Sequence, residues 1–250
     1  MRGMDAAITL DGRVALVTGG SRGIGRGIAQ TLARAGAAVA VNYRGREDEA
    51  AATVAAIERA GGTAVAVRAN VADRAEVEAM AARVGAALGP IDVLINNAGI
   101  ATIRGLDDLT EADFDETLAV NLKSAFLCTQ TVVPGMRSRG WGRIVNISSV
   151  AARGAGGVGV HYNASKAGLE GLTRGYSARL AADGITVNAV APGLVDTEMA
   201  APLKEAGVAD RLPVGRIGAP EEIGRAVLMV LTNGYLTGQT IAVNGGGSFI

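Results

Sequence analysis

The chain has 250 residues, and its 24 basic and 24 acidic side chains give a formal net charge of zero. This balance, without a long basic run, argues against a nucleic-acid partner. The single cysteine, Cys128, excludes an internal disulfide and is expected to be a small buried side chain. Because the sequence has no apolar run of about 18 residues and its first residues lack a signal-peptide core, we expect a cytoplasmic protein without a membrane partner.

Short β-branched runs alternate along the chain with longer alanine-rich stretches. We expect strands at residues 13–18, 38–42, 63–69, 91–95, 143–147, 185–191 and 239–243. We expect helices from a glycine-rich turn to about residue 34, at 47–60, 74–88, 111–133 and 162–182, and from Pro220 onward. This alternation predicts a parallel sheet covered on both faces, and right-handed crossovers then give a doubly wound α/β fold.

The domain organisation is predicted to be a single unit, residues 1–250, with an N-terminal extension at 1–11 and an irregular loop at 193–218. The alternative is a division near residue 135 into two α/β halves. We disfavour that division because the glycine-rich turn and the candidate catalytic residues lie on opposite sides of it.

A glycine-rich segment, Thr18-Gly19-Gly20-Ser21-Arg22-Gly23-Ile24-Gly25, lies between the first expected strand and helix. Glycines let the backbone turn sharply and approach a phosphate closely. The following helix N-terminus offers free N–H groups and the positive end of its dipole to a pyrophosphate. The spacing differs from the usual dinucleotide fingerprint, so a purely structural turn is the alternative.

Tyr162 and Lys166 are four residues apart, and Ser149 precedes the tyrosine by thirteen. Positions i and i+4 share one face of a helix, so the ammonium is expected beside the phenol, where it would lower the tyrosine pKa below about 10. Ser149, at a strand end, can hydrogen-bond a carbonyl or hydroxyl. The three side chains indicate a proton-transfer site for an alcohol–ketone pair, although a lone Tyr-x-x-x-Lys is more often a surface contact.

These segments, with Asn96-Asn97-Ala98-Gly99, Asn121 and Pro192-Gly193, occur in the order typical of short-chain dehydrogenases/reductases. The chain resembles this family from about Leu10 to Val243. The resemblance implies a seven-stranded, mostly parallel Rossmann-type sheet and hydride transfer between a nicotinamide cofactor and a carbonyl or secondary alcohol. It implies four catalytic residues, with a water held in the proton relay: Asn121, Ser149, Tyr162 and Lys166.

The same resemblance implies the cofactor site and no metal. Its expected residues are Gly19, Ser21, Arg22, Gly23, Ile24, Gly25, Asn42, Tyr43, Arg44, Asn70, Val71, Asn97, Ala98, Gly99, Tyr162, Lys166, Pro192, Gly193, Val195 and Thr197. A carboxylate ending the second strand would select NAD, but no acid occurs there before Glu47. Arg22 and Arg44 could instead bracket a 2′-phosphate, so NADP(H) is favoured and NAD(H) stays possible. Asn70 replaces a common aspartate, and its oxygen could still accept from the adenine.

The substrate is less well defined. Segments such as NYRGRE and TVNAVAPGLVDTEM resemble bacterial 3-oxoacyl-(acyl-carrier-protein) reductases, which commonly dock their acidic carrier on two arginines beside the active-site entrance. Gly140 and Asp183 stand at those positions, and Asp183 would repel the carrier. Arg137, Arg139 and Arg143 could substitute, although ordinary surface charges are the simpler interpretation.

The favoured function is therefore reduction of a small or medium ketone or an acyl thioester. A carrier-protein-dependent 3-oxoacyl reductase is the alternative, and a non-catalytic NADPH-binding regulator is a further alternative that the complete catalytic set argues against. The resemblance also implies a homotetramer and a substrate loop at residues 193–218. His161 is expected to pack or to line the edge of the pocket.

Overall fold

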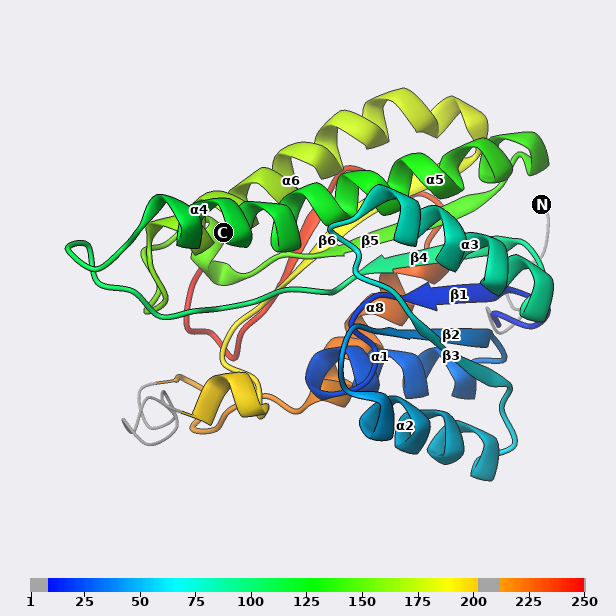
Figure 1. Cartoon of the computed structure of the whole chain (residues 1–250), viewed down its shortest axis with the longest axis horizontal. Helices are drawn as coiled ribbons and strands as arrows, with labels where there is room; N and C mark the ends of the chain where they lie inside the picture. The colour runs from blue at the N-terminus through cyan, green and yellow to red at the C-terminus, as the bar shows by residue number, and fades with distance from the viewer. Residues whose placement is uncertain (1–8, 202–211, 250) are drawn as a thin grey trace.

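The computed structural model describes residues 9–201 and 212–249, and its seven strands form one sheet (Figure 1). The strands are β1 Val14–Val17, β2 Ala38–Tyr43, β3 Ala64–Arg68, β4 Ile91–Asn96, β5 Gly142–Ile147, β6 Ile185–Pro192 and β7 Thr240–Val243. Their order is β3-β2-β1-β4-β5-β6-β7, and each neighbouring pair is parallel. The doubly wound parallel sheet is confirmed, and strands from both sides of residue 135 belong to it.

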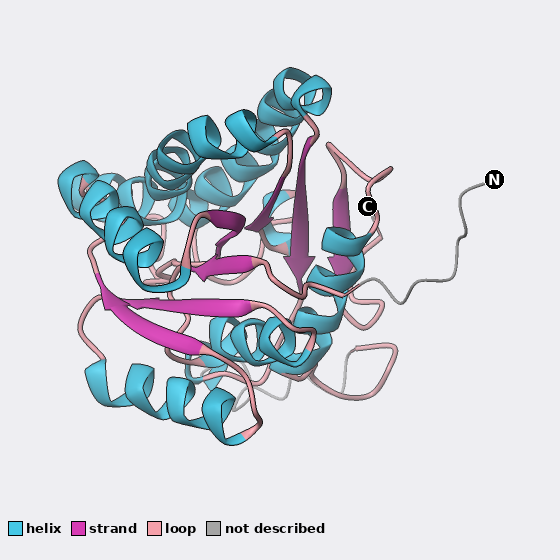
Figure 2. Ribbon diagram, turned by 90° about the vertical axis from the view of Figure 1, so that its right-hand side faces the viewer, coloured by secondary structure: helices cyan, strands magenta, loops and turns pink. Residues whose placement is uncertain are grey.

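Helices cover both faces of this sheet (Figure 2). They are α1 Gly23–Arg34, α2 Glu47–Arg59, α3 Arg74–Leu88, α4 Glu111–Leu118, α5 Ser124–Arg139, α6 Val160–Leu180 and α8 Pro220–Thr232. Helices α1, α2 and α8 lie on one face, and α3, α4, α5 and α6 lie on the other (Figure 1). Each expected helix therefore exists, and crossover connections alternate with strands as the sequence pattern predicts.

Strand β1 shows why these short segments are apolar throughout. Ala15 and Val17 belong to the core cluster that contains residues of α1 and α8, whereas Val14 and Leu16 belong to the cluster under α3 and α5. Successive side chains of a strand point to opposite faces, and here both faces are covered. The strand is thus a continuous hydrophobic run instead of an alternating one.

The stretch expected as one helix at 111–133 differs in the structure. It consists of α4, a π-helical turn at Ala119–Lys123, and α5, which continues past Pro134 to Arg139. The π turn carries Asn121, whose side chain bonds to the backbone of Ile100 on a neighbouring loop. The predicted end at 133 is wrong because α5 tolerates the missing N–H of its proline.

The two segments expected to be least regular lie partly outside the described residues. These segments are the N-terminal extension, of which residues 1–8 are not described, and the 193–218 loop, of which 202–211 are not described. Leu10 is buried, and its N–H donates to the Ala35 carbonyl, so the end of the expected extension belongs to the core. The described part of the loop contains a 3-10 turn at Glu198–Ala200 and a bridge between Val195 and Gly218. Within the described ranges, helices long and apolar enough to cross a membrane are absent.

Candidate active site

The strand order reverses between β1 and β4, and the glycine-rich turn lies at this point. The chain runs outward from β1 to β2 and β3, then returns to β4 on the other side of β1. In open α/β sheets, ligands bind at the carboxyl ends of the strands where the order reverses. Asn97, after β4, donates from Nδ2 to the carbonyls of Thr18 at 2.9 Å and Gly19 at 3.0 Å. The two predicted cofactor segments are therefore joined here.

The turn is closed so tightly that two of its glycines cannot be replaced without movement. A Cβ on Gly25 would lie 2.2 Å from the Gly19 carbonyl oxygen. Gly19 has a φ of +61°, and a Cβ on it would lie 3.0 Å from the Ala98 Cα. Of the described side chains, none caps the following helix, which starts after Arg22. The bare backbone and the uncapped helix N-terminus fit a pyrophosphate.

The side chains of two residues expected at the cofactor site are buried. The Asn42 Oδ1 accepts from the Gly19 N–H at 3.1 Å, and its Nδ2 donates to the carbonyls of Val67 and Ala69. Tyr43 belongs to the core cluster that contains residues of α1. The Asn42 side chain therefore braces the glycine-rich turn from inside the protein.

On the expected adenine side, Asn70 is already partly engaged. Its Oδ1 accepts from the Ala72 N–H at 3.2 Å, and its own N–H donates to Glu76 at 2.8 Å. Val71 is buried. An amide oxygen has two lone pairs, so Asn70 can still accept a second hydrogen bond.

The structure adds Arg46 to the two arginines, Arg22 and Arg44, that are expected near a 2′-phosphate. Arg44 is exposed, whereas Arg22 shares a carboxylate, Glu198, with Arg46. Arg46 Nη2 lies 3.4 Å from Glu198 Oε1. Sequence reasoning missed Arg46 and Glu198. The only signal in the sequence was that Arg46 follows Arg44 by two residues. The pairing of Arg46 with Glu198 had no local signal, because the two residues are 152 positions apart.

Three of the expected catalytic residues lie close together, between the carboxyl end of β5 and the first turns of α6. They are Ser149, Tyr162 and Lys166. Lys166 is buried, and its Nζ donates to the Ile147 carbonyl at 2.9 Å. The same Nζ lies 5.6 Å from the centroid of the Tyr162 ring. Ser149 lies near enough to the Tyr162 hydroxyl to lower the pKa of that phenol. The i, i+4 spacing thus places ammonium and phenol together, as predicted.

The pKa of the Tyr162 phenol is raised above its ordinary value because of burial, and the Ser149 side chain opposes this rise only in part. The expected acidification by Lys166 is therefore wrong in this structure. Burial lowers the pKa of Lys166 from 10.5 to about 8. The phenol is thus protonated at neutral pH, and Lys166 is the member of the pair that titrates near neutrality.

The π-helical turn at Ala119–Lys123 places Asn121 beside the other three expected catalytic residues. Its Oδ1 accepts from the Ile100 N–H at 2.8 Å, and its Nδ2 donates to the Ile100 carbonyl at 3.0 Å and to Ser165 Oγ at 3.1 Å. A Cβ on Gly99 would lie 3.2 Å from Asn121 Oδ1 and 3.6 Å from Lys166 Nζ. The structure therefore brings all four expected residues to one place.

Further residues that the sequence did not single out hold the loop between Ser149 and Tyr162. Asn163 Nδ2 donates to the carbonyls of Ala151, Gly154 and Ala155 at 2.6–2.8 Å. Because a single amide closes this loop on α6, the position of the serine is fixed relative to the tyrosine.

Two other predicted side chains are packing residues. His161 is fully buried, and its Nε2 lies 3.0 Å from the Thr102 carbonyl oxygen. Cys128 is buried, and burial raises the pKa of its thiol to about 12.

The segment after β6 passes over the glycine-rich turn. A Cβ on Gly193 would lie 2.8 Å from the Asn244 Cα, and one on Gly23 would lie 3.2 Å from the Thr197 methyl. Val195 is buried. Thr197 therefore lies against the glycine-rich turn, whereas Gly193 packs against Asn244.

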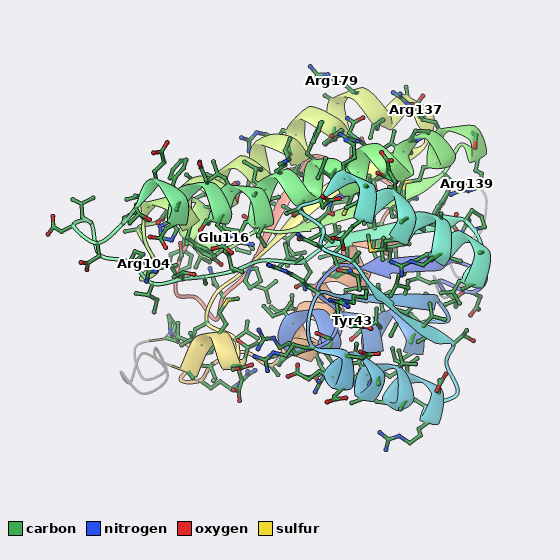
Figure 3. All side chains as sticks on the ribbon, in the orientation of Figure 1. Tyr43, Arg104, Glu116, Arg137, Arg139 and Arg179 are labelled. Atoms are coloured by element: carbon green, nitrogen blue, oxygen red, sulfur yellow. The ribbon has the colours of Figure 1, made fainter. Side chains whose placement is uncertain are left out.

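The expected carrier-docking positions lie at the other end of the helices. Asp183 follows α6, about 30 Å of helix from Tyr162 at 1.5 Å per residue, and it pairs with Arg137 Nε at 2.6 Å. Arg139 bonds to the Ile91 carbonyl at 2.7 Å, and Arg143 stacks on a tryptophan ring. Figure 3 shows Arg137 and Arg139 at one end of the molecule and Arg104 at the opposite end. The arginines that could substitute are thus engaged within the chain.

Comparisons with known proteins agree with this geometry. Residues 13–207 match the family model described as short chain dehydrogenase. The chain is 43% identical over 243 residues to acetoacetyl-CoA reductase of Rhizobium meliloti, covering 95% of this chain and 99% of that protein. It is 43% identical over 237 residues to a 3-oxoacyl-[acyl-carrier-protein] reductase of Staphylococcus aureus, covering 93% and 96%.

Among solved structures, a short-chain dehydrogenase/reductase from Serratia marcescens superposes with a TM-score of 0.88 at 40% identity, covering 95% of this chain and 98% of that one. The family uses NAD or NADP, and its members act on hydroxyl and keto groups. The fold, the reversal-point turn and these matches together show that the chain belongs to the short-chain dehydrogenase/reductase family of oxidoreductases.

Proposed function

We propose that the protein uses NADPH to reduce the ketone of a small or medium carbonyl compound, with 3-oxoacyl thioesters as the preferred class. The observation that carries the proposal is the convergence of Ser149, Tyr162, Lys166 and Asn121 at the open edge of the sheet. A pure NADPH-binding regulator would not need this set of proton-handling groups.

In the proposed mechanism, Ser149 and Tyr162 hydrogen-bond the substrate oxygen. When bound, the nicotinamide supplies a hydride to the carbonyl carbon. Tyr162, protonated at neutral pH because burial raises its pKa, donates a proton to the oxygen. Lys166 stabilises the phenolate left behind, and Asn121 holds a water through which the proton is replaced. Alcohol oxidation follows the same path in reverse.

The proposed preference for NADPH rests on charge. Arg22 and Arg46 both pair with the carboxylate of Glu198. A planar guanidinium group binds a phosphate in the same way. The strand β2 ends without a carboxylate that could accept from a ribose 2′-hydroxyl. Gly19 and Gly25 let the turn close on itself, and the helix that follows has no side-chain cap, so its first N–H groups can bind the pyrophosphate.

The proposed substrate class takes support from two relatives whose names describe reduction of acetoacetyl-CoA and of a 3-oxoacyl group on a carrier protein. A carrier protein as the obligatory donor of the acyl group is the weaker candidate. Asp183 neutralises Arg137, and glycine occupies the other position at which an arginine could dock an acidic carrier.

The function is tested by following cofactor oxidation with NADPH and NADH against acetoacetyl-CoA, the acetoacetyl carrier protein and simple ketones. We expect the highest kcat/KM with NADPH and the coenzyme A thioester. Binding of NADPH without turnover on every compound would instead support the regulator. A clear preference for NADH would reject the proposed choice of cofactor.

We also propose a homotetramer that buries an apolar groove between α5 and α6. Leu118, Leu122, Phe126 and Leu172 line this groove, and Phe126 is 38% exposed. Phe126→Glu would place a charge in that contact, so we expect sedimentation velocity to show a smaller assembly than for the unchanged protein. Ala55→Glu adds the same charge on the exposed face of α2 and is expected to change nothing. A monomeric unchanged protein at micromolar concentration would contradict the assembly.

A further inference from the structure

Glu198 joins the loop after β6 to the two arginines beside the expected ribose. It lies on the 3-10 turn Glu198–Ala200 and pairs with Arg22 of the glycine-rich turn and with Arg46, the residue before α2. The carboxylate is 64% exposed, and the two guanidinium groups are 45% and 51% exposed. Three segments far apart in sequence thus meet around one anionic group.

The two arginines come from the two segments that border the ribose in this kind of crevice, the glycine-rich turn and the end of β2. The charges of Arg22 and then of Arg46 lower the pKa of the Glu198 carboxyl. The carboxylate is therefore ionised and occupies a place suited to any anion that two guanidinium groups can share.

We propose that Glu198 is an internal competitor for the 2′-phosphate of the cofactor, and that the phosphate, on binding the arginines, releases the loop after β6 from the glycine-rich turn. This inference rests on the proposed use of NADPH. It adds a residue that sets cofactor specificity and links cofactor choice to the segment beside the substrate position.

The charges favour such an exchange. Exposed ion pairs stabilise weakly, because water screens them and two long side chains must be held still. A phosphate carries up to two negative charges and more acceptor oxygens than a carboxylate. NADH has no group to exchange for Glu198, so the Glu198 contacts persist when NADH binds. Thr197, the neighbour of Glu198, lies in the same contact, because a Cβ on Gly23 would be 3.2 Å from its methyl group.

The first test is cofactor binding measured by fluorescence titration, without substrate. We expect Glu198→Gln to lower the Kd for NADPH by about 1.5-fold to fivefold, the range set by loss of a surface ion pair. The Kd for NADH should change less. Glu58→Gln removes the same charge on α2 away from the crevice and serves as the matched control. The fragments 2′,5′-ADP and 5′-AMP should reproduce the difference, because only the first carries the 2′-phosphate.

The second test reports on the loop itself. Met199, the neighbour of Glu198, is 54% exposed, so Met199→Cys can be labelled with a maleimide fluorophore, while Cys128 is buried and unreactive. Addition of 2′,5′-ADP should lower the anisotropy of the label, and 5′-AMP should not. In the Glu198→Gln background the anisotropy should already be low before addition.

The outcomes separate this inference from the proposed function. If the unchanged protein prefers NADH but Glu198→Gln gains NADPH affinity, the inference holds and the proposed cofactor choice fails. If the protein prefers NADPH, yet Glu198→Gln leaves both Kd values and the label unchanged, the inference is overturned and the cofactor choice stands. Weaker NADPH binding by Glu198→Gln would also overturn it, because the carboxylate would then assist the phosphate.

Discussion

Tyr162→Phe is expected to lower kcat for ketone reduction by about 10²- to 10⁴-fold, the usual contribution of a positioned general acid. The change removes the only atom that the proposed mechanism uses for proton donation and keeps the ring in place. Ser149 is a neighbour of the Tyr162 hydroxyl, and the expected cofactor contacts lie mainly on the glycine-rich turn. The Kd for NADPH should therefore stay within about threefold, as for loss of one modest hydrogen bond. Stopped-flow measurement of cofactor oxidation gives kcat, and fluorescence titration gives Kd.

Tyr176→Phe is the matched control for this variant. Tyr176 lies on the same helix, and its hydroxyl accepts from Gln130 at 3.0 Å. It is fourteen residues, or about 21 Å of helix at 1.5 Å per residue, from Tyr162. We expect its kcat to equal that of the unchanged protein. Near-normal turnover by Tyr162→Phe, with NADPH binding intact, would mean that the proton comes from another group.

The sequence predicted the sheet well because the sheet depends on local patterns that repeat. Each strand is a short apolar run that is buried on both faces, so its limits are clear within one or two residues. The sequence spacing of Tyr162 and Lys166 also determines how their side chains lie in the structure. The i, i+4 relation of Tyr162 and Lys166 on α6 brings their side chains together whatever the rest of the chain does.

What the sequence did not predict depends on contacts between distant segments. The π turn at Asn121 exists because the amide bonds to Ile100 across a loop. The ion pair between Arg46 and Glu198 joins residues 152 positions apart, so no local pattern reveals it. The rise in the Tyr162 pKa reflects burial by the folded protein, which spacing along one helix does not reveal. Local rules therefore give the positions of the groups, and tertiary packing sets their electrostatics.

Lys166→Met is expected to lower kcat and to remove a pH-dependent step from the reaction. In the unchanged protein, Lys166 has a pKa of about 8 and carries its charge below that pH. The charge stabilises the phenolate that forms when Tyr162 donates its proton, so kcat for reduction should fall as the pH rises through about 8. A pH profile from 6 to 10, at roughly saturating NADPH, should show this decrease in the unchanged protein and a flat, lower profile in the variant.

Lys166→Arg tests whether the charge at this position causes the decrease in kcat. An arginine stays protonated across the pH range, so the decrease should move beyond it.

The pH dependence of stability is an independent test of the lowered Lys166 pKa. Because the folded pKa of Lys166 is lowered from 10.5 to about 8, the unfolded chain holds the extra proton between these values, and the free energy of unfolding gains a contribution that rises with pH there. In urea titrations, unchanged protein should therefore gain stability relative to Lys166→Met from pH 8 to 10. A constant difference would show that the lysine titrates normally, and the pH decrease in kcat would then need another source.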